Sequence, residues 1–316
     1  MAATTDFVAA QKQNRRNTML LLAGLTALAA LVGYLIGALL EGEASDNMPL
    51  VSSAGIFAAA LMGAVSVGWS AISLAVGDKM VLTMAGAKEI DKAGAPQLYN
   101  VVEEISIASG VPMPKVMVLE TEALNAFATG NRIGNGTIAV TRGLLDKLSR
   151  DELQGVVAHE MAHLANLDTR YMVVVGVTVG LIALVCDMAL RTLNWGSVQR
   201  RSNSKGSSGG GILIIVLLVV AILAPLAAKA VQMAVSRQRE YLADATSVQF
   251  TRNPNGLISA LGKLAEAAAP FPGVSRATQH LFIVNPLHQF TSKTPALLAT
   301  HPDIQDRIVR LRNLGS

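Results

Sequence analysis

The sequence has 316 residues, of which 51% are hydrophobic and only 15% are charged, with a formal net charge of +4 and a mean hydropathy of +0.43. Soluble globular proteins carry about 25% charged residues, and a disordered chain would lack this much apolar surface, so both classes are excluded. The small net charge, without a long basic block, argues against nucleic acid as a partner. The single cysteine, Cys186, excludes an intramolecular disulfide and a metal site built from several thiolates. The composition therefore indicates a membrane protein.

Four apolar stretches indicate where the chain meets the lipid bilayer, at residues 18–40, 50–76, 171–190 and 211–228. The first two are 23 and 27 residues long and carry no charge, and about 20 apolar residues suffice to cross the hydrocarbon core. The third stretch contains Asp187 and the fourth contains Pro225, so these two either cross the bilayer or lie in its interface. We expect about four transmembrane or membrane-associated helices.

Basic residues near these stretches predict the orientation of the chain. Lys12, Arg15 and Arg16 precede the first stretch; a secretory signal peptide is the alternative there, but the length of the stretch and the closeness of the second favour an uncleaved anchor. The loop between the first two stretches has no basic residue, which predicts a cytoplasmic N-terminus and a cytoplasmic segment 77–170. Four basic residues in the loop 191–205 conflict with an outside position for that loop, so the topology of the second pair stays open.

The polar segment that follows mixes helix and strand signals. A helix is expected at 96–109, where apolar residues recur at spacings of three and four. Asn135-Gly136 is a turn signal that predicts a hairpin. Three short extended runs are expected at 115–120, 125–129 and 137–141.

The most informative string is His159-Glu160-Met161-Ala162-His163. It lies within a helix that a capping box, Ser149 and Glu152, begins and that we expect to reach about Ala165. Histidines four positions apart lie on one face of a helix, so both imidazoles can bind one metal ion, and Glu160 can accept a proton from water at that ion. The alternative, a chance occurrence of the string, is less favoured because the helix is predicted independently.

Two histidines leave a catalytic zinc site one protein ligand short. We interpret Glu240, in a helix expected at 232–250, as the third ligand, because the two apolar stretches between the motifs return the chain to the same side of the membrane. Asp244 lies one helical turn later and could hold a ligating imidazole by its free nitrogen. The alternative is that this charged run is a solvated interfacial helix. Residues 254–316 are expected to be mostly helical.

These residues resemble the M48 family of zinc metallopeptidases, most closely its HtpX-like membrane branch. Besides the two motifs, the resemblance rests on further blocks that occur in order between about residues 80 and 312. They are Asn125-Ala126-Phe127-Ala128, Thr141-Arg142-Gly143-Leu144-Leu145, Phe282-Ile283-Val284-Asn285-Pro286, and Thr300-His301-Pro302 followed by Arg307-Ile308.

The resemblance implies an α-helical membrane protein with an α+β, zincin-like (gluzincin) catalytic domain. We predict an N-terminal transmembrane hairpin at 1–76, the first part of the catalytic domain at 77–170, a second membrane hairpin at 171–231 and the second catalytic part at 232–316. The implied activity is that of a membrane-bound endopeptidase with one Zn2+ per chain. Its ligands would be His159, His163 and Glu240, with Glu160 as the general base.

Two further site predictions follow from the resemblance. Asn125, Ala126 and Phe127 would form an edge strand along which an unfolded substrate aligns, since a free strand edge binds any extended backbone; an ordinary loop or an internal strand is the alternative. His301 would donate a hydrogen bond to the oxyanion, or else it caps a helix that begins near Pro302.

The resemblance also suggests a location and partners. The chain would be a multi-pass protein of the plasma (inner) membrane with its catalytic domain facing the cytoplasm, and it would cut misfolded or damaged membrane proteins in quality control, in cooperation with an ATP-dependent membrane protease. One alternative is an intramembrane metalloprotease, which the polar residues flanking the histidine motif disfavour. Another is a non-enzymatic transporter or scaffold with an inert histidine pair, which the lack of polar residues in the first two apolar stretches disfavours.

Overall fold

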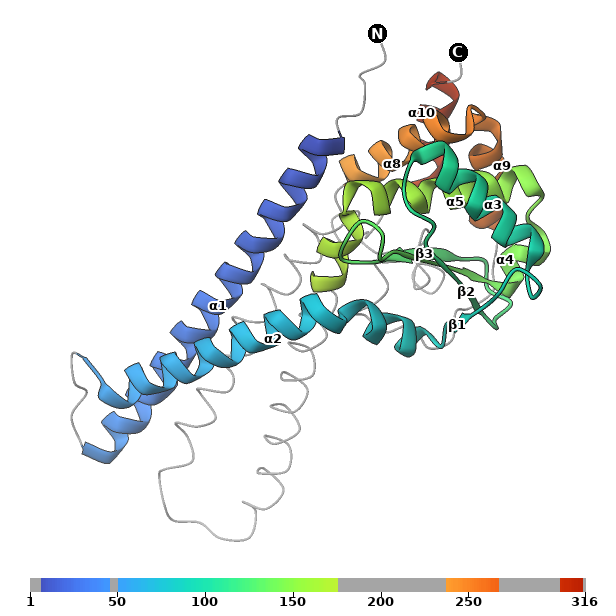
Figure 1. Ribbon diagram of the computed structural model, residues 1–316. Helices are drawn as coiled ribbons and strands as arrows, with labels where there is room; N and C mark the ends of the chain where they lie inside the picture. The colour runs from blue at the N-terminus through green and yellow to red at the C-terminus, as the bar shows by residue number, and fades with distance from the viewer. Residues whose placement is uncertain (1–6, 46–50, 176–236, 267–301, 315–316) are drawn as a thin grey trace, which may run out of the picture. The chain divides into compact units, whose positions relative to one another are not determined.

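The computed structural model describes residues 7–45, 51–175, 237–266 and 302–314 (Figure 1). The chain divides into two compact units, which we describe separately: Met1–Asn17, Leu74–Gly176 and Val231–Ser316 form the first, and Thr18–Ser73 and Val177–Ala230 form the second. The described helices are α1 (Phe7–Ser45), α2 (Ser53–Ala85), α3 (Pro96–Ser109), α4 (Arg142–Lys147), α5 (Arg150–Asn166), α8 (Arg237–Thr251), α9 (Pro254–Glu266) and α10 (Ile304–Leu314), and the strands are β1 (Lys88–Glu89), β2 (Lys115–Leu119), β3 (Ala126–Thr129) and β4 (Thr137–Thr141).

The second unit contains most of α1 and α2, the helices of the first two apolar stretches. Lys12–Ala38 and Ser53–Ala85 are long and apolar enough to cross a membrane by length and composition. Many of their large apolar side chains, among them Leu20, Phe57 and Val65, are exposed, which is the arrangement that suits contact with lipid rather than with a protein core. The third and fourth predicted stretches lie almost entirely outside the described residues, and the predicted four-part division of the chain stays a prediction.

Small residues let α1 and α2 approach closely. Gly33 and Gly37 are four positions apart on α1, and a Cβ atom at either position would overlap the backbone of Ala58 or Ala54 on α2. This is the small-residue packing typical of membrane helix pairs. The Glu41 carboxylate accepts a hydrogen bond from the Ala54 backbone N–H (3.0 Å), so the pair is also held where α2 begins.

The first unit is built on a four-stranded sheet of order β1-β2-β4-β3. Strand β2 runs parallel to β4, and β3 pairs antiparallel with β4, with Ala126 opposite Val140, so the predicted hairpin is confirmed. Its turn lies earlier than predicted: the Asn135 N–H donates to the Arg132 carbonyl, and the left-handed residue is Gly134 (φ +86°). Gly136 is needed for another reason, because a Cβ atom there would be 2.9 Å from the Leu164 side chain.

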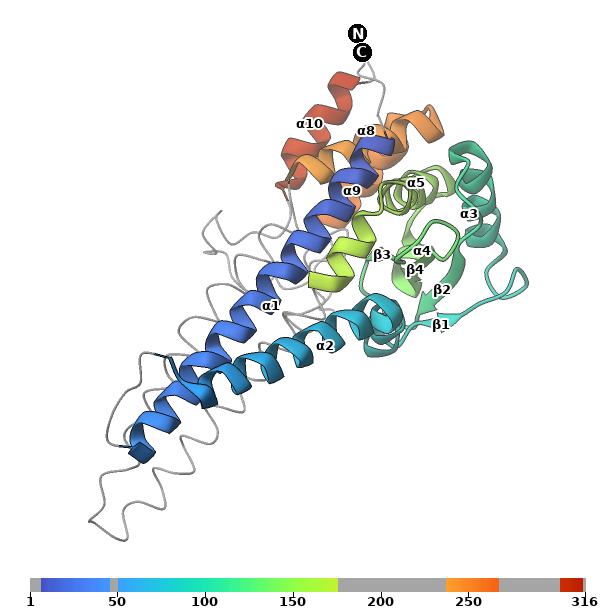
Figure 2. The same ribbon diagram turned by 60° about the vertical axis from the view of Figure 1, so that its left-hand side comes forward.

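Helix α5 is the centre of the first unit. Helices α3, α5, α8 and α9 gather on one side of the sheet in both views (Figures 1 and 2), and buried side chains from α3, α5 and α9 join those of the sheet in one core. The predicted capping box of α5 is present, with Ser149 and Glu152 bonded reciprocally, and α3 has its predicted bounds. The core thereby holds α5, the helix of the histidine motif, at a fixed position.

Candidate metal centre

Helix α5 directs its two motif histidines toward each other. His159 and His163 are buried, at 1% and 5% exposure, and their Nε2 atoms are 3.2 Å apart. The two rings are perpendicular, with centroids 4.8 Å apart. One turn of a helix that is capped at its start and packed along its length therefore fixes the spacing of both imidazoles.

Glu240 reaches the same point from α8. Its Oε2 atom lies 3.6 Å from His159 Nε2, and its Oε1 atom lies 3.7 Å from His163 Nε2. One nitrogen or oxygen atom from each of the three residues lies within 4.8 Å of the other two, and all three side chains are buried. The structure thus brings together the three residues that the two sequence motifs singled out.

A carboxylate holds the outward nitrogen of each imidazole. His159 Nδ1 is 3.0 Å from Asp244 Oδ1, and His163 Nδ1 is 3.0 Å from Asp168 Oδ2. A carboxylate can only accept a hydrogen bond, so the proton of each ring belongs on Nδ1 and a lone pair on Nε2. Carboxylate–histidine pairs of this kind orient imidazoles that bind metal ions. Asp244 therefore has the position predicted for it.

The arrangement of donors fits a metal ion. Two Nε2 lone pairs beside the Glu240 carboxylate repel one another unless a cation, either a proton or a metal ion, lies among them. Burial and the Arg307 charge lower the pKa of His159, but hydrogen bonds with Asp244 and Glu240, together with the charge of Asp244, outweigh both and raise that pKa to about 9. A metal ion that binds these atoms would displace the proton, as is general for histidine sites.

Arg307 on α10 completes the surroundings of the centre. It is fully buried, and its Nε and Nη2 atoms donate to the two oxygens of Asp244 at 2.9 and 2.6 Å. Its Nη1 atom lies 3.5 Å from Glu240 Oε2. The guanidinium charge, opposed by burial, lowers the pKa of the Asp244 carboxyl. Arg307 therefore favours the ionised form of Asp244 and places a positive charge beside Glu240.

Sequence reasoning noted Arg307 in a motif but gave it no role. The sequence does contain a signal that Arg307 is buried, because Arg307 lies three residues after Ile304 and four before Leu311. It thus occupies the apolar face of an amphipathic helix, where a charge requires a buried partner.

Glu160 follows the first histidine and is 2% exposed. Burial raises the pKa of its carboxyl, while the positive charges of the histidines lower that pKa to a lesser extent. A general base works best when its pKa lies near the operating pH, so the direction of this shift suits a proton carrier.

The predicted substrate segment lies at an edge of the sheet among the described strands, but its residues are buried, at 3% exposure or less. Ala126 and Phe127 belong to β3, and β3 has β4 as its neighbour on one side among the described strands. Asn125 precedes β3, and its Oδ1 atom accepts from the Ala126 N–H at 3.0 Å. His301 lies outside the described residues, as does the block at 282–286.

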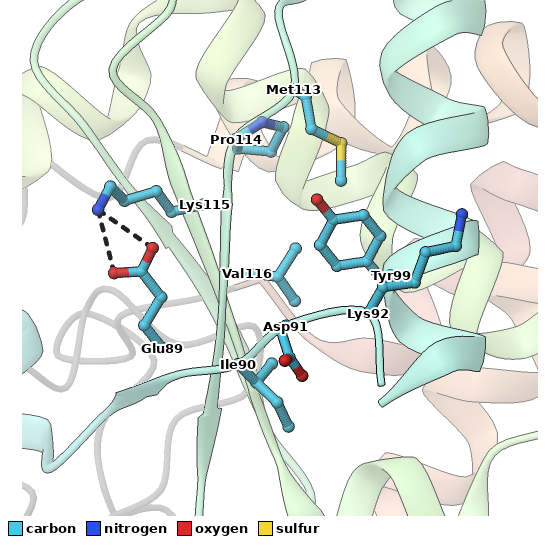
Figure 3. A pocket seen from close by; sticks show the side chains of 9 residues that line it. All are labelled: Glu89, Ile90, Asp91, Lys92, Tyr99, Met113, Pro114, Lys115 and Val116. Carbon is cyan, nitrogen blue, oxygen red and sulfur yellow. Dashed lines mark hydrogen bonds and ion pairs between the residues drawn. The ribbon is translucent and has the colours of Figure 1, made fainter. Parts of the chain in front are cut away.

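The opposite edge of the sheet carries a hollow of about 640 Å³ between β1 and α3. Figure 3 shows its lining, in which Lys115 pairs with Glu89 (3.0 Å) on one side of β2 and Lys92 lies beside the Tyr99 ring, 5.7 Å from its centroid, on the other. None of the predicted site residues lines this hollow. The chemistry therefore belongs to the buried group on α5 and α8 rather than to this surface depression.

A buried His-His-Glu group on two helices, with a glutamate directly after the first histidine, is typical of metallopeptidases. The chain belongs to peptidase family M48, whose family model matches residues 92–314. It is similar to proteins named protease HtpX homolog from Listeria monocytogenes (40% identity over 95% of this chain and 97% of the relative) and Listeria innocua (42%, same coverage). A third, from Caldanaerobacter subterraneus, is 44% identical over 75% of this chain and 78% of its own.

Among solved structures, the chain is similar to S. mikatae Ste24p, with 17% identity and a TM-score of 0.46 over 95% of this chain and 66% of that one. Family membership and the apolar helices establish a membrane metalloprotease, an enzyme rather than a transporter or scaffold.

Proposed function

We propose that this protein is a zinc-dependent endopeptidase that binds one Zn2+ through His159, His163 and Glu240. The observation that carries the proposal is the convergence of these three buried side chains, with the outward nitrogen of each histidine held by a carboxylate. Two imidazole nitrogens and one carboxylate oxygen are the donors of many catalytic zinc sites, which keep a further position open for water and substrate.

In the proposed mechanism, a bound zinc ion supplies Lewis-acid chemistry, since it polarises the scissile carbonyl and makes water more acidic. Glu160 accepts the proton of the attacking water and returns it to the leaving amine. Asp244 and Asp168 hold the imidazoles in the tautomer that leaves Nε2 available. Arg307 favours the ionised form of Asp244 and pairs with Glu240, so His159 and Glu240 stay in place while the proton moves.

We further propose that substrate aligns along β3, as predicted for Asn125, Ala126 and Phe127. The Thr141 N–H donates to the Asn125 carbonyl at 3.0 Å, and antiparallel pairing alternates, so Ala126 and Ala128 direct their carbonyls away from β4. We expect Ala128→Pro, which removes an outward N–H, to raise KM for an unfolded reporter without changing zinc content. Ala128→Gly keeps the N–H and is the control.

His301 remains the proposed donor to the oxyanion, on the strength of the family resemblance. Loss of one such donor costs about 10²- to 10³-fold in kcat. We expect this loss in His301→Ala with an unchanged Tm; a fall in Tm with unchanged kcat would instead indicate the helix cap near Pro302.

The proposed setting is the plasma (inner) membrane, with about four membrane-associated helices that include 171–190 and 211–228, and a catalytic domain facing the cytoplasm. Lys12, Arg15 and Arg16 before the first helix support that orientation. Misfolded or damaged membrane proteins are the proposed substrates, and an ATP-dependent membrane protease is the proposed partner. Protease protection of tags placed in each loop, in inside-out vesicles, tests the topology.

The central experiment measures zinc content and cleavage of a soluble unfolded reporter on detergent-purified protein. Glu160→Gln should keep about one zinc per chain but lose cleavage, and Glu240→Ala should lose zinc. Undiminished cleavage by Glu160→Gln would remove that residue from its role. Cleavage of membrane spans alone, with no cleavage of the soluble reporter, would instead favour the intramembrane metalloprotease.

A further inference from the structure

Asp168 lies where side chains from three helical segments meet. Its Oδ2 atom accepts from His163 Nδ1 at 3.0 Å, and its Oδ1 atom accepts from Asn14 Nδ2 at 2.6 Å. Arg239 on α8 is more distant, with its Nε atom 3.7 Å from Oδ1. Because the two short hydrogen bonds use different oxygens, they fix the rotation of the carboxylate plane.

Asn14 belongs to the beginning of α1, in the part of that helix that lies in the first unit. It is only 6% exposed, whereas its neighbours at 12, 13, 15 and 16 are exposed. Its amide nitrogen also donates to the Asn166 carbonyl at 2.9 Å. Both partners are pure acceptors, so the NH2 group of Asn14 must face them, and one orientation of the amide satisfies both.

We propose that Asn14 is a positioning residue of the metal centre, which acts through Asp168 on the imidazole of His163. The inference rests on the proposed ligand role of His163. Without the Asn14 donor, Oδ1 of this buried carboxylate would keep, among the described residues, only the more distant Arg239 as a polar partner, and the carboxylate could turn away from His163. The helix that begins the first membrane span thereby takes part in holding a metal ligand.

A simpler role for Asn14 would be to dock α1 against residues 166–168 without influence on the metal. If docking is its only role, replacing Asn14 lowers the stability of the metal-free and the zinc-loaded protein equally. The zinc affinity then stays unchanged. Positioning, in contrast, changes zinc affinity and the geometry at the metal. The two roles therefore differ in quantities that can be measured without any proteolytic assay.

The test uses the full chain in detergent, with Asn14→Ala and, as the matched control, Gln13→Ala at the exposed neighbouring position. Zinc affinity is measured by competition with a chelator. Loss of a direct partner of a ligating histidine typically weakens metal binding roughly 10- to 100-fold; Asn14 acts one residue further out, so we expect a loss of about three- to tenfold. Gln13→Ala should bind zinc as the unaltered protein does. The visible spectrum of the Co2+-substituted protein should change in Asn14→Ala alone.

A double-variant comparison tests the route through Asp168. If Asn14 acts through this carboxylate, Asn14→Ala combined with Asp168→Asn should bind zinc no more weakly than Asp168→Asn alone. Additive losses would overturn the proposed route. Should Asn14→Ala not fold, Asn14→Asp keeps the side-chain size but opposes two carboxylates, and it should weaken zinc binding more than tenfold.

Unchanged zinc affinity and an unchanged cobalt spectrum in the Asn14 variants would overturn the inference. His163→Ala separates this failure from failure of the proposed function. If His163→Ala loses zinc while the Asn14 variants keep it, only the positioning role is wrong. If His163→Ala also keeps zinc at full affinity, the proposed ligand set itself is wrong.

Discussion

On one side of the metal centre, the His159 imidazole bonds to Asp244, a carboxylate that the buried guanidinium of Arg307 holds with two hydrogen bonds. On the other side, the His163 imidazole bonds to Asp168, whose short additional bond comes from the neutral amide of Asn14. Each histidine is thus oriented by a carboxylate, but Asp244 is hydrogen-bonded directly by a full positive charge. Asp168 receives its short bond from a neutral amide, and its counter-charge, Arg239, lies farther away at 3.7 Å.

The Arg307 guanidinium, which holds Asp244, and the Asn14 amide, which holds Asp168, therefore have different tasks. A buried bidentate guanidinium offsets the charge of both Asp244 and Glu240, so its loss affects folding as well as metal binding. A neutral amide orients a carboxylate without changing the net charge of the site, so its loss should affect geometry more than folding. Substitutions of these residues and their carboxylate partners should therefore differ in how strongly they affect stability and zinc binding.

Arg307→Met should have the largest effect. Removing one partner of a buried ion pair destabilises a protein by about 3–5 kcal/mol, because Asp244 and Glu240 would remain as buried acids without their counter-charge. Chemical unfolding of the metal-free protein measures this loss, and zinc content should fall with it. Arg310→Met is the control, since Arg310 lies on the same helix but is exposed, over the Tyr241 ring. A similar stability loss in both variants would refute the special role of Arg307.

Asp244→Asn and Asp168→Asn compare the two carboxylates directly. Each removes a carboxylate that holds an imidazole of the proposed zinc site, so each should weaken zinc binding about 10- to 100-fold. Their effects on the metal-free protein should differ, because Asp244→Asn leaves the Arg307 charge buried beside a neutral amide. Thermal unfolding in excess chelator should show the larger fall in Tm for Asp244→Asn. A larger fall in Tm for Asp168→Asn would mean that Asp168, rather than Asp244, interacts more strongly with a buried positive charge.

Glu152→Gln should have the smallest effect on stability and should leave zinc binding unchanged. Glu152 accepts from Lys263 at 2.7 Å and joins α5 to α9. Burial raises the pKa of its carboxyl, but Lys263, Ser259 and the Ser149 N–H outweigh burial and lower that pKa to about 2. A depressed pKa stabilises the fold above the unfolded-state value, near 4.5, and this stabilisation is lost as the pH falls through about 2.

The Tm difference between Glu152→Gln and the unaltered protein should therefore be full above about pH 5 and should vanish towards about pH 2. Zinc affinity at neutral pH should not change. Glu103→Gln is the control, because Glu103 forms an exposed pair with Lys92, and exposed pairs contribute little. A pH-independent Tm difference would show that the charge of Glu152 is not the cause.

Local patterns in the sequence predicted the features that depend on neighbouring residues. The bounds of α3 follow from apolar spacing, and the start of α5 follows from the reciprocal bonds of Ser149 and Glu152. The histidine pair lies on one helical face for the same reason. These elements were predictable because their determinants are separated by only three or four residues.

The contacts that complete the site were not predictable in this way. Arg307 bonds to Asp244 across 63 positions, and Asn14 bonds to Asp168 across 154. Such pairs depend on tertiary packing, which no local period encodes. The hairpin turn was misplaced for a related reason, since Gly136 is required by packing against Leu164 from another element rather than by its own backbone angle.

The contribution of α10 has a consequence for biosynthesis. The ribosome makes α5 and α8 well before α10, so the nascent chain carries the three converging side chains without the guanidinium that balances Asp244 and Glu240. Two adjacent acids that lack this cation resist burial, so we expect α8, which bears both, to pack less firmly against α5 until α10 has been made. We therefore expect zinc binding to reach full strength only after translation has passed Arg307.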